Sequence, residues 1–307
     1  MALDADGIVA RRRLRRRLAV WRLLAVVAVA VLVVVAVAVA TGVQPFGPRD
    51  HVLRVTVSGI VYDDPAILDG LADAAENPQT RAVMVVIDTP GGTTTGGESI
   101  YRELRRLSEQ GVPVVAVIRT VGASAGYMIA LASDRIFALE TSITGSIGVL
   151  LETAEVSGLL EKLGVTAETF ASGPLKGQPS PLQPLTDDAR TATQSLIDDV
   201  HAWFLDVFIE RRGLPPEEAQ RLADGRAYSG RQALANRLID AIGGEREALA
   251  WLVAERHVSA DIPVLDLDTG EEPPGLFDLI TGLTKKTLLS ERLRLDGLIS
   301  VWHAGEN

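Results

Sequence analysis

The sequence contains no cysteine, which excludes disulfide bonds, thiolate zinc sites and a cysteine nucleophile. Histidine is scarce, and no histidine lies in a polar loop beside a candidate nucleophile, so a Ser-His-Asp triad is poorly supported. The four copies are His51, His201, His257 and His303. Neither a P-loop motif nor a His-Glu-x-x-His motif occurs. We therefore expect chemistry that needs no metal and no organic cofactor.

Lysine is almost absent as well, because arginine supplies nearly all of the 30 basic residues. The four lysines are Lys162, Lys176, Lys285 and Lys286. Genomic base composition is enough to explain this scarcity. A lysine within a polar loop still has chemical interest, because burial can neutralise an amine near neutral pH, whereas a guanidinium keeps its proton.

Negative charge dominates the chain, whose formal net charge is −10, but it is unevenly distributed. Residues 1–22 hold seven arginines against Asp4 and Asp6, a balance of +5, which leaves −15 for the remainder. An acidic body argues against a nucleic acid as the partner.

An uncharged run extends from Leu23 to Val43 and consists mostly of Val, Ala and Leu. As a helix it would span about 31 Å, which matches the apolar core of a bilayer. The arginine-rich stretch Arg11–Arg17 precedes it, and positive charge stays on the cytoplasmic side. We therefore expect a single-pass anchor in the cytoplasmic membrane, with the N-terminus inside and the body on the extracytoplasmic, or periplasmic, side. Cleavage as a signal peptide after Ala38-Val39-Ala40 remains the alternative.

The rest of the chain alternates apolar runs with amphipathic stretches, which predicts an α/β fold with a parallel-rich sheet. We expect strands at Val52–Val61, Ala82–Asp88, Val114–Ile118, Arg135–Leu139, Ile147–Leu151 and Val165–Ala171, and a tight turn at Thr89–Gly92. Helices are expected over Pro65–Asn77, Ser124–Ser133, Val156–Leu163, Asp187–Arg212, Pro216–Ala223, Gly230–Leu238 and Glu245–His257, with another ending near Gln110.

Five segments follow from this pattern. They are a basic cytoplasmic N-terminus (1–22), the anchor (23–43), a linker (44–51), one main domain (52–257) and a C-terminal tail (258–307). The tail contains an amphipathic stretch, Leu276–Val301, for which the sequence indicates no clear fold.

Ser124 is a candidate nucleophile because it follows a predicted buried strand and opens a short predicted helix. The small residues of Gly122–Gly126 leave room for a substrate and for close backbone approach. Free N–H groups at a helix N-terminus, together with the helix dipole, can stabilise an oxyanion. The alternative is that Ser124 is an ordinary helix N-cap.

Three other motifs carry little information individually. Gly91-Gly92 ends a predicted strand, where two glycines can turn a backbone N–H toward a neighbouring strand end, although an ordinary turn is the more common case. The hydroxyl-bearing stretch Thr144–Gly148 resembles a turn or a bulge. Lys176 lies in the Pro/Gly-rich loop Ser172–Pro181, where most lysines are merely solvated.

In combination, the motifs resemble signal peptide peptidase A (SppA), in its short membrane-anchored bacterial form, over residues 52–250. Four blocks match in order: Asp88–Gly92; Ala123–Ala130 followed by Ser133–Ile136; Thr144–Val149; and Arg226–Leu234 with Leu238–Asp240 and Gly243-Gly244. An anchor in the right place precedes them.

The resemblance implies a fold of repeated ββα units, as in the Clp protease and crotonase superfamily. It also implies a Ser124 nucleophile with Lys176 as general base, oriented by Ser146. The N–H groups of Gly91 and Ala125 would form the oxyanion hole. Implied substrates are signal peptides left in the membrane and other short apolar peptides, and the family forms ring-like homo-oligomers.

Two departures from the family pattern concern these residues. Ala125 replaces the first of two glycines that usually follow the nucleophile, although its N–H donor survives. Gly177-Gln178-Pro179 replaces a more usual acidic start after the lysine, which weakens the assignment of Lys176 more than that of Ser124.

Other functions fit the sequence less well. Crotonase-type folds also bind acyl-CoA, but the acidic, lysine-poor body offers no basic groove for it. A non-catalytic membrane scaffold is an alternative of a different class. A related membrane peptidase that cuts membrane-protein tails would use the same chemistry, and the sequence does not separate it from SppA.

Overall fold

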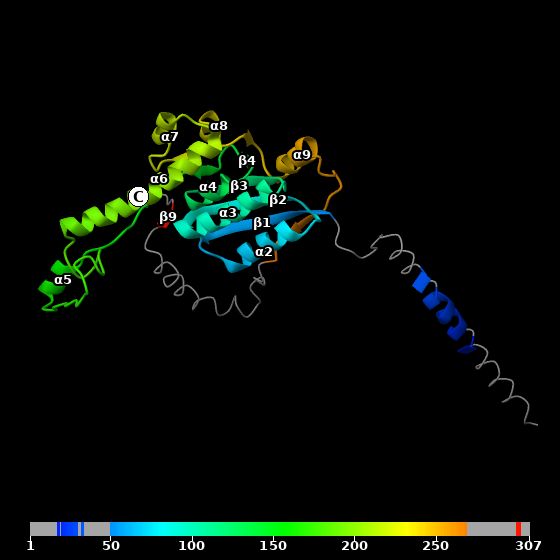
Figure 1. Ribbon diagram of the computed structural model, residues 1–307, viewed down its shortest axis with the longest axis horizontal. Coiled ribbons are helices and arrows are strands. Elements are labelled where there is room, and N and C mark those ends of the chain that lie inside the picture. The colour runs from blue at the N-terminus through cyan, green and yellow to red at the C-terminus, as the bar shows by residue number, and fades with distance from the viewer. Residues whose placement is uncertain (1–16, 19, 30–31, 34–49, 269–298, 302–307) are drawn as a thin grey trace, which may run out of the picture. The chain divides into compact units, whose positions relative to one another are not determined.

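The structure is a computed structural model that describes residues 17–18, 20–29, 32–33, 50–268 and 299–301 (Figure 1). The chain divides into two compact units, residues 1–49 and 50–307. In the first unit the described residues are helical. The predicted anchor, Leu23–Val43, is described only at residues 23–29 and 32–33, and its remainder lies outside the described residues. None of the helices described is both long enough and apolar enough to cross a membrane.

The second unit is built on one sheet, in which nine strands are described. They are β1 (His51–Val61), β2 (Thr80–Thr93), β3 (Val114–Ala123), β4 (Arg135–Ala138), β5 (Ile143–Gly145), β6 (Ala227–Ser229), β7 (Ala241–Ile242), β8 (Val264–Asp266) and β9 (Ile299–Val301). The order is β6-β5-β3-β2-β1-β8, with β4 and β7 beyond the first half of β3. All pairings are parallel except β2–β9 and β5–β6, so the predicted parallel-rich α/β fold is confirmed.

Helices cover both faces of this sheet (Figure 1). They are α2 (Pro65–Glu76), α3 (Thr94–Glu109), α4 (Ala125–Ala130), α5 (Ser157–Lys162), α6 (Asp187–Arg212), α7 (Pro216–Leu222), α8 (Gly230–Ala235) and α9 (Glu245–Arg256). On β2, Val83, Val85 and Ile87 belong to the core shared with α2, α3, α4 and α6, whereas Met84 and Val86 belong to the core shared with α9. β2 is therefore buried on both faces, which is why its sequence is a continuous apolar run.

Three expected elements differ from the structure. The turn predicted at Thr89–Gly92 is instead the irregular end of β2, which continues to Thr93. The strand predicted at Ile147–Leu151 is wrong, because β5 comes earlier in the chain. Val165–Ala171 forms no strand: no neighbouring strand pairs with it, and its Phe170 is 93% exposed. β-Branched composition does not make a strand where no neighbour completes the ladder.

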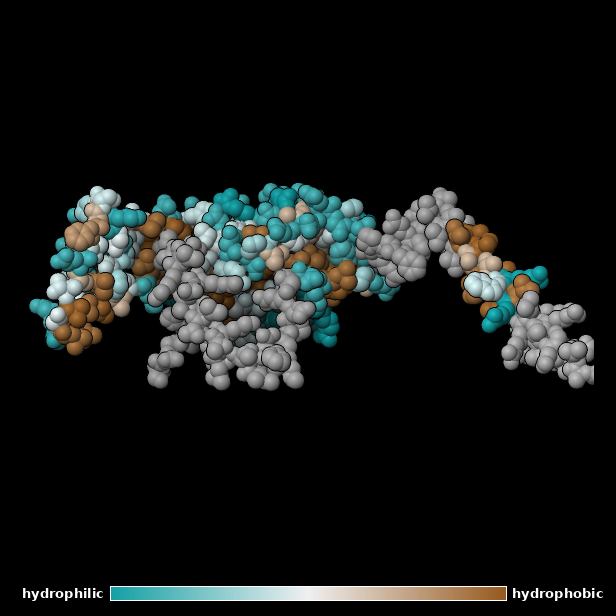
Figure 2. Space-filling model, turned by 90° about the horizontal axis from the view of Figure 1, so that it is seen from below, coloured by the Kyte–Doolittle hydropathy of each residue, from teal (hydrophilic) through white to brown (hydrophobic). Residues whose placement is uncertain are grey.

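Residues 151–200, here called the arm, project from the sheet at one end of the second unit (Figure 1). The arm contains α5 and the first half of α6. Along α6, Ala189 is the single buried residue before Phe204, so half of the helix lacks a core to cover. Figure 2 shows apolar side chains gathered on the arm, and its exposed residues include Leu159, Leu163, Val165, Leu175, Leu182 and Leu196.

Part of the expected C-terminal tail belongs to the sheet. β8 pairs in parallel with β1, and β9 pairs antiparallel with the end of β2. Arg54 of β1 donates two hydrogen bonds to Asp266 of β8 and a third to Glu245 of α9, which holds β8 and α9 to the sheet. The amphipathic stretch Leu276–Val301 lies outside the described residues except for β9.

Candidate active site

Ser124 lies between the end of β3 and the first residue of α4 and is 1% exposed. Its backbone has φ 56° and ψ −117°, a region that residues with a side chain rarely adopt. Such strain costs about 1–3 kcal/mol and persists only where the surrounding structure imposes it. The side chain makes no capping bond to α4, so Ser124 is not a conventional N-cap.

The neighbouring strand β5 imposes this conformation. The Ser124 N–H donates to the Gly145 carbonyl at 2.8 Å, one residue beyond the paired residues Ala123 and Gly145. On the other side, Met128 N–H donates to the Ser124 carbonyl at 2.9 Å and starts α4. The sharp change from strand to helix thus has a hydrogen bond on either side of Ser124.

Ser146 follows Gly145 and lies next to this turn. It also has a positive φ, 50°, and it is 7% exposed. Its N–H donates to the Arg226 carbonyl at 2.9 Å. Within the described part of the chain the Ser146 hydroxyl has no hydrogen-bond partner. A hydroxyl both donates and accepts hydrogen bonds, so Ser146 can orient an incoming polar group.

Gly91 lies on the adjacent strand β2 with φ 123°, a conformation suited to glycine. Its N–H donates to the Thr89 hydroxyl oxygen at 3.0 Å, so this predicted oxyanion donor already has a bond within the protein. β2 and β3 meet at the pair Thr89–Gly122. This pairing places residues 90–92, here called the Gly91 segment, beside the strand that leads to Ser124.

Close backbone approach joins α4 to the start of α3. A Cβ atom on Gly97 would lie 3.1 Å from the Ala125 Cβ, and one on Gly126 would lie 2.6 Å from the Thr89 Cγ2. The methyl group of Ala125 therefore fits above Gly97. Ala125 is the first residue of α4, and N–H groups in a first helical turn have no acceptor within the helix.

Tyr127 fixes α4 from its buried side. Its hydroxyl donates to the Leu238 carbonyl at 2.8 Å, and its ring contacts Phe208 edge-on at 6.1 Å. Complete burial raises the pKa of Tyr127, so the phenol stays protonated as a donor. The backbone at Leu238 thereby supports α4, the helix that begins directly after Ser124.

Lys176 is located elsewhere, on the arm. It is exposed, and its N–H donates to Gly173 in a local turn at 3.1 Å. The structure therefore brings Ser124, Ala125, Ser146 and the Gly91 segment together at one edge of the sheet. It leaves Lys176 on the projecting arm (Figure 1).

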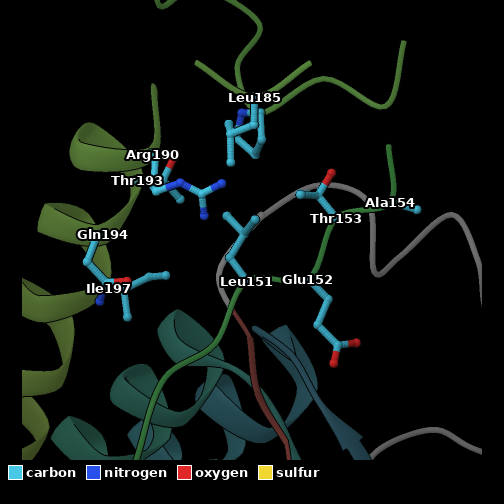
Figure 3. A pocket seen from close by; sticks show the side chains of 10 residues that line it. Leu151, Glu152, Thr153, Ala154, Leu185, Arg190, Thr193, Gln194 and Ile197 are labelled. Carbon is cyan, nitrogen blue, oxygen red and sulfur yellow. The ribbon is translucent and has the colours of Figure 1, made fainter. Parts of the chain in front are cut away.

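A cavity of about 630 Å³ lies at the root of the arm. Its walls are the chain after Ser146, the loop after Lys176 and the exposed half of α6, and its lining includes Leu151, Pro179, Leu185, Arg190 and Ile197. Leu151 and Arg190 point into it and Glu152 points away (Figure 3). Among the described residues, no three His, Asp or Glu side chains are grouped so that they could hold a metal ion.

Sequence reasoning assigned no individual role to two residues that hold the site in place. Asp88 accepts the Val121 N–H at 3.1 Å, and Thr89 accepts the Gly91 N–H. The available signal was their position, since they are the first polar residues after the apolar run Ala82–Ile87.

Comparison with known proteins identifies the family. Residues 106–259 match peptidase family S49. A Synechocystis protein provisionally named a protease is 36% identical over 236 residues, covering 76% of this chain and 84% of its own length. An Enterococcus faecium protein provisionally named signal peptide peptidase SppA is 31% identical, over 68% and 64% of the two chains. The chloroplastic serine protease SPPA of Arabidopsis thaliana is 28% identical, over 76% and 34%. The chain therefore belongs to peptidase family S49 and is an SppA-type serine peptidase.

Proposed function

We propose that this protein is a membrane-anchored endopeptidase that degrades cleaved signal peptides and other short apolar peptides with a Ser124–Lys176 dyad. The observation that carries the proposal is the strained, buried conformation of Ser124, with Ser146 placed next to it by the pairing of β3 and β5. Strain of this kind concentrates at functional sites. We also propose that the α/β sheet is built from repeated ββα units, as in the Clp protease and crotonase superfamily.

In the proposed mechanism, Ser124 Oγ attacks the scissile carbonyl carbon and its proton passes to the neutral Lys176 amine. Ser146 orients that amine. The N–H groups of Ala125 and the Gly91 segment stabilise the oxyanion, a contribution of ~2.7–4 kcal/mol per donor in comparable sites. The C–N bond then breaks, and the lysine returns the proton to the leaving amine. Lys176 next removes a proton from water, which hydrolyses the acyl-enzyme.

β9 supports an extended-peptide substrate. It pairs antiparallel with β2, with Val301 opposite Gly91 and Ile299 opposite Thr93. The edge of the sheet beside the oxyanion residues therefore accepts an apolar strand, which is the strand-addition mode of peptide recognition. We infer that substrate binds along the same edge.

The position of Lys176 supports a ring-like homo-oligomer. Lys176 is exposed on the arm, whereas a catalytic lysine must lie within hydrogen-bonding reach of the serine hydroxyl. The exposed apolar residues of the arm, among them Leu159, Leu163 and Phe170, would be buried against a second copy. We propose that assembly brings the arm of one copy, with Lys176, to Ser124 of its neighbour.

The proposed location is the cytoplasmic membrane, with the N-terminus inside and residues 50–307 on the extracytoplasmic side. The uncharged run Leu23–Val43 and the preceding arginines support it. No nucleic acid partner is proposed for an acidic body.

The test is covalent labelling of the purified, membrane-extracted protein with an active-site serine reagent, paired with cleavage of a synthetic signal peptide. We expect labelling and cleavage in the wild type and neither in Ser124→Ala, with the oligomer unchanged. A non-catalytic scaffold would give no labelling. A peptidase for membrane-protein tails would be labelled but would prefer a tail peptide to the signal peptide.

A further inference from the structure

Two irregularities interrupt the sheet at one level, directly before the candidate site. Between β1 and β2 the pairs Ser58–Asp88 and Ile60–Gly91 leave one extra residue in β2. Between β2 and β3 the pairs Ile87–Ile118 and Thr89–Gly122 leave two extra residues in β3. Bulges of this type re-aim the chain and leave backbone groups without ladder partners.

Thr89 bridges the first irregularity. It is 0% exposed. Its hydroxyl donates to the Gly59 carbonyl of β1 and accepts the Gly91 N–H at 3.0 Å. Its methyl group occupies the space above Gly126 in α4. The Thr89 side chain thus ties the irregular end of β2 at Gly91 to β1 and to α4, the helix that begins after Ser124.

Asp88 bridges the second irregularity from the opposite side of the same strand. One carboxylate oxygen accepts the Val121 N–H at 3.1 Å, and the other accepts the Thr120 hydroxyl at 3.4 Å. Those residues belong to the extra length of β3 that leads into Ser124. Asp88 and Thr89 are consecutive in β2. Asp88 holds the part of β3 that leads to Ser124, and Thr89 holds the Gly91 segment.

We propose that Asp88 and Thr89 are positioning residues of the peptidase, which set the spacing between Ser124 and the Gly91 segment. The inference rests on the proposed function. Neither side chain needs to touch the substrate. Each one hydrogen-bonds to a backbone segment at a point where the regular hydrogen bonds between strands are interrupted. A displacement of about 1 Å in a catalytic arrangement can cost ~100-fold in rate.

Thr89→Val tests this with little change of shape, because it removes the hydroxyl and keeps the methyl group. The matched control is Thr80→Val at the start of the same strand, where the buried hydroxyl has no partner among the described residues. We expect Thr89→Val to lower kcat by ~10–100-fold with KM nearly unchanged. Thr80→Val should retain the wild-type kcat, and Thr89→Ser, which keeps the hydroxyl but loses the methyl group, should lose less activity than Thr89→Val.

If Thr89→Val does not fold, the Asp88 pair serves as the second measurement. Asp88→Asn keeps an oxygen that accepts the Val121 N–H and should be nearly as active as the wild type, whereas Asp88→Ala should lose kcat. A wild-type kcat in Thr89→Val, or an equal loss in Thr89→Ser or in Thr80→Val, would overturn the inference. So would equal activity of the two Asp88 variants. A wild type without Ser124-dependent cleavage would instead defeat the proposed function.

Discussion

Ser124 and Ser146 both have a positive φ, of 56° and 50°, and each lies one residue beyond the paired residues Ala123 and Gly145. The hydrogen bond from the Ser124 N–H to the Gly145 carbonyl joins their two strands at this point. The two hydroxyl groups are therefore placed by a single strand pairing. This relationship defines the site more closely than either residue does separately.

The strain at Ser124 predicts an unusual order of stability. Ser124→Gly should be about 1 kcal/mol more stable to unfolding than Ser124→Ala, because glycine adopts a positive φ without steric cost. Chemical denaturation of both inactive variants measures the difference. Ser108, within α3, is the control, since there alanine should be the more stable of the pair by about 1 kcal/mol. Equal stability of the two Ser124 variants would mean that the backbone is not strained.

The placement of Lys176 on the arm predicts complementation between inactive chains. Ser124→Ala and Lys176→Ala should each be inactive alone while still assembling. Co-expressed, they should regain part of the wild-type cleavage rate, because some sites then combine an intact serine with an intact lysine from another copy. No recovery would place both residues of the dyad in the same chain. Wild-type turnover by Lys176→Ala alone would refute its role as the base.

The β2–β9 pairing predicts that weakening β9 favours substrate. Ser300 lies opposite Gly92 in the middle of the three-residue strand β9, and Ser300→Pro should disrupt it because proline is confined to strand starts, edge strands and bulges. Loss of about 1 kcal/mol of competing strand pairing should lower KM for an apolar peptide by roughly fivefold and leave kcat unchanged. Ser300→Ala, which keeps the N–H group, is the control. A KM that does not move would show that β9 and the substrate use different edges.

Tyr127 predicts how strongly α4 is anchored. Tyr127→Phe leaves the buried Leu238 carbonyl without its donor and should reduce the free energy of unfolding by ~1–3 kcal/mol. Tyr101→Phe provides the comparison, because this half-buried ring keeps its edge contact with Trp203 and should change stability by less than about 0.5 kcal/mol. Thermal denaturation of both variants checks the prediction. Similar losses in the two would show that the hydroxyl of Tyr127 adds nothing specific.

Much of the architecture was predictable because it depends on local patterns. The apolar run Ala82–Ile87 indicates a strand buried on both faces, and the periodicity of Asp187–Arg212 gives the full extent of α6. Ser124 could be singled out from the small residues around it. Val165–Ala171 failed because its composition resembles a strand, while a ladder needs a neighbour that composition does not reveal.

By itself, the sequence determined the α/β class, the absence of cysteine chemistry and the set of candidate residues, because each follows from residue type and short-range spacing. Tertiary structure alone decided that Ser124 and Ser146 meet through Gly145, that Thr89 already holds the Gly91 N–H, and that Lys176 stands on the arm. Those relations depend on strand register and on contacts between residues far apart in the chain. A shift of one residue in either register would separate the two serines, and no local pattern encodes that register.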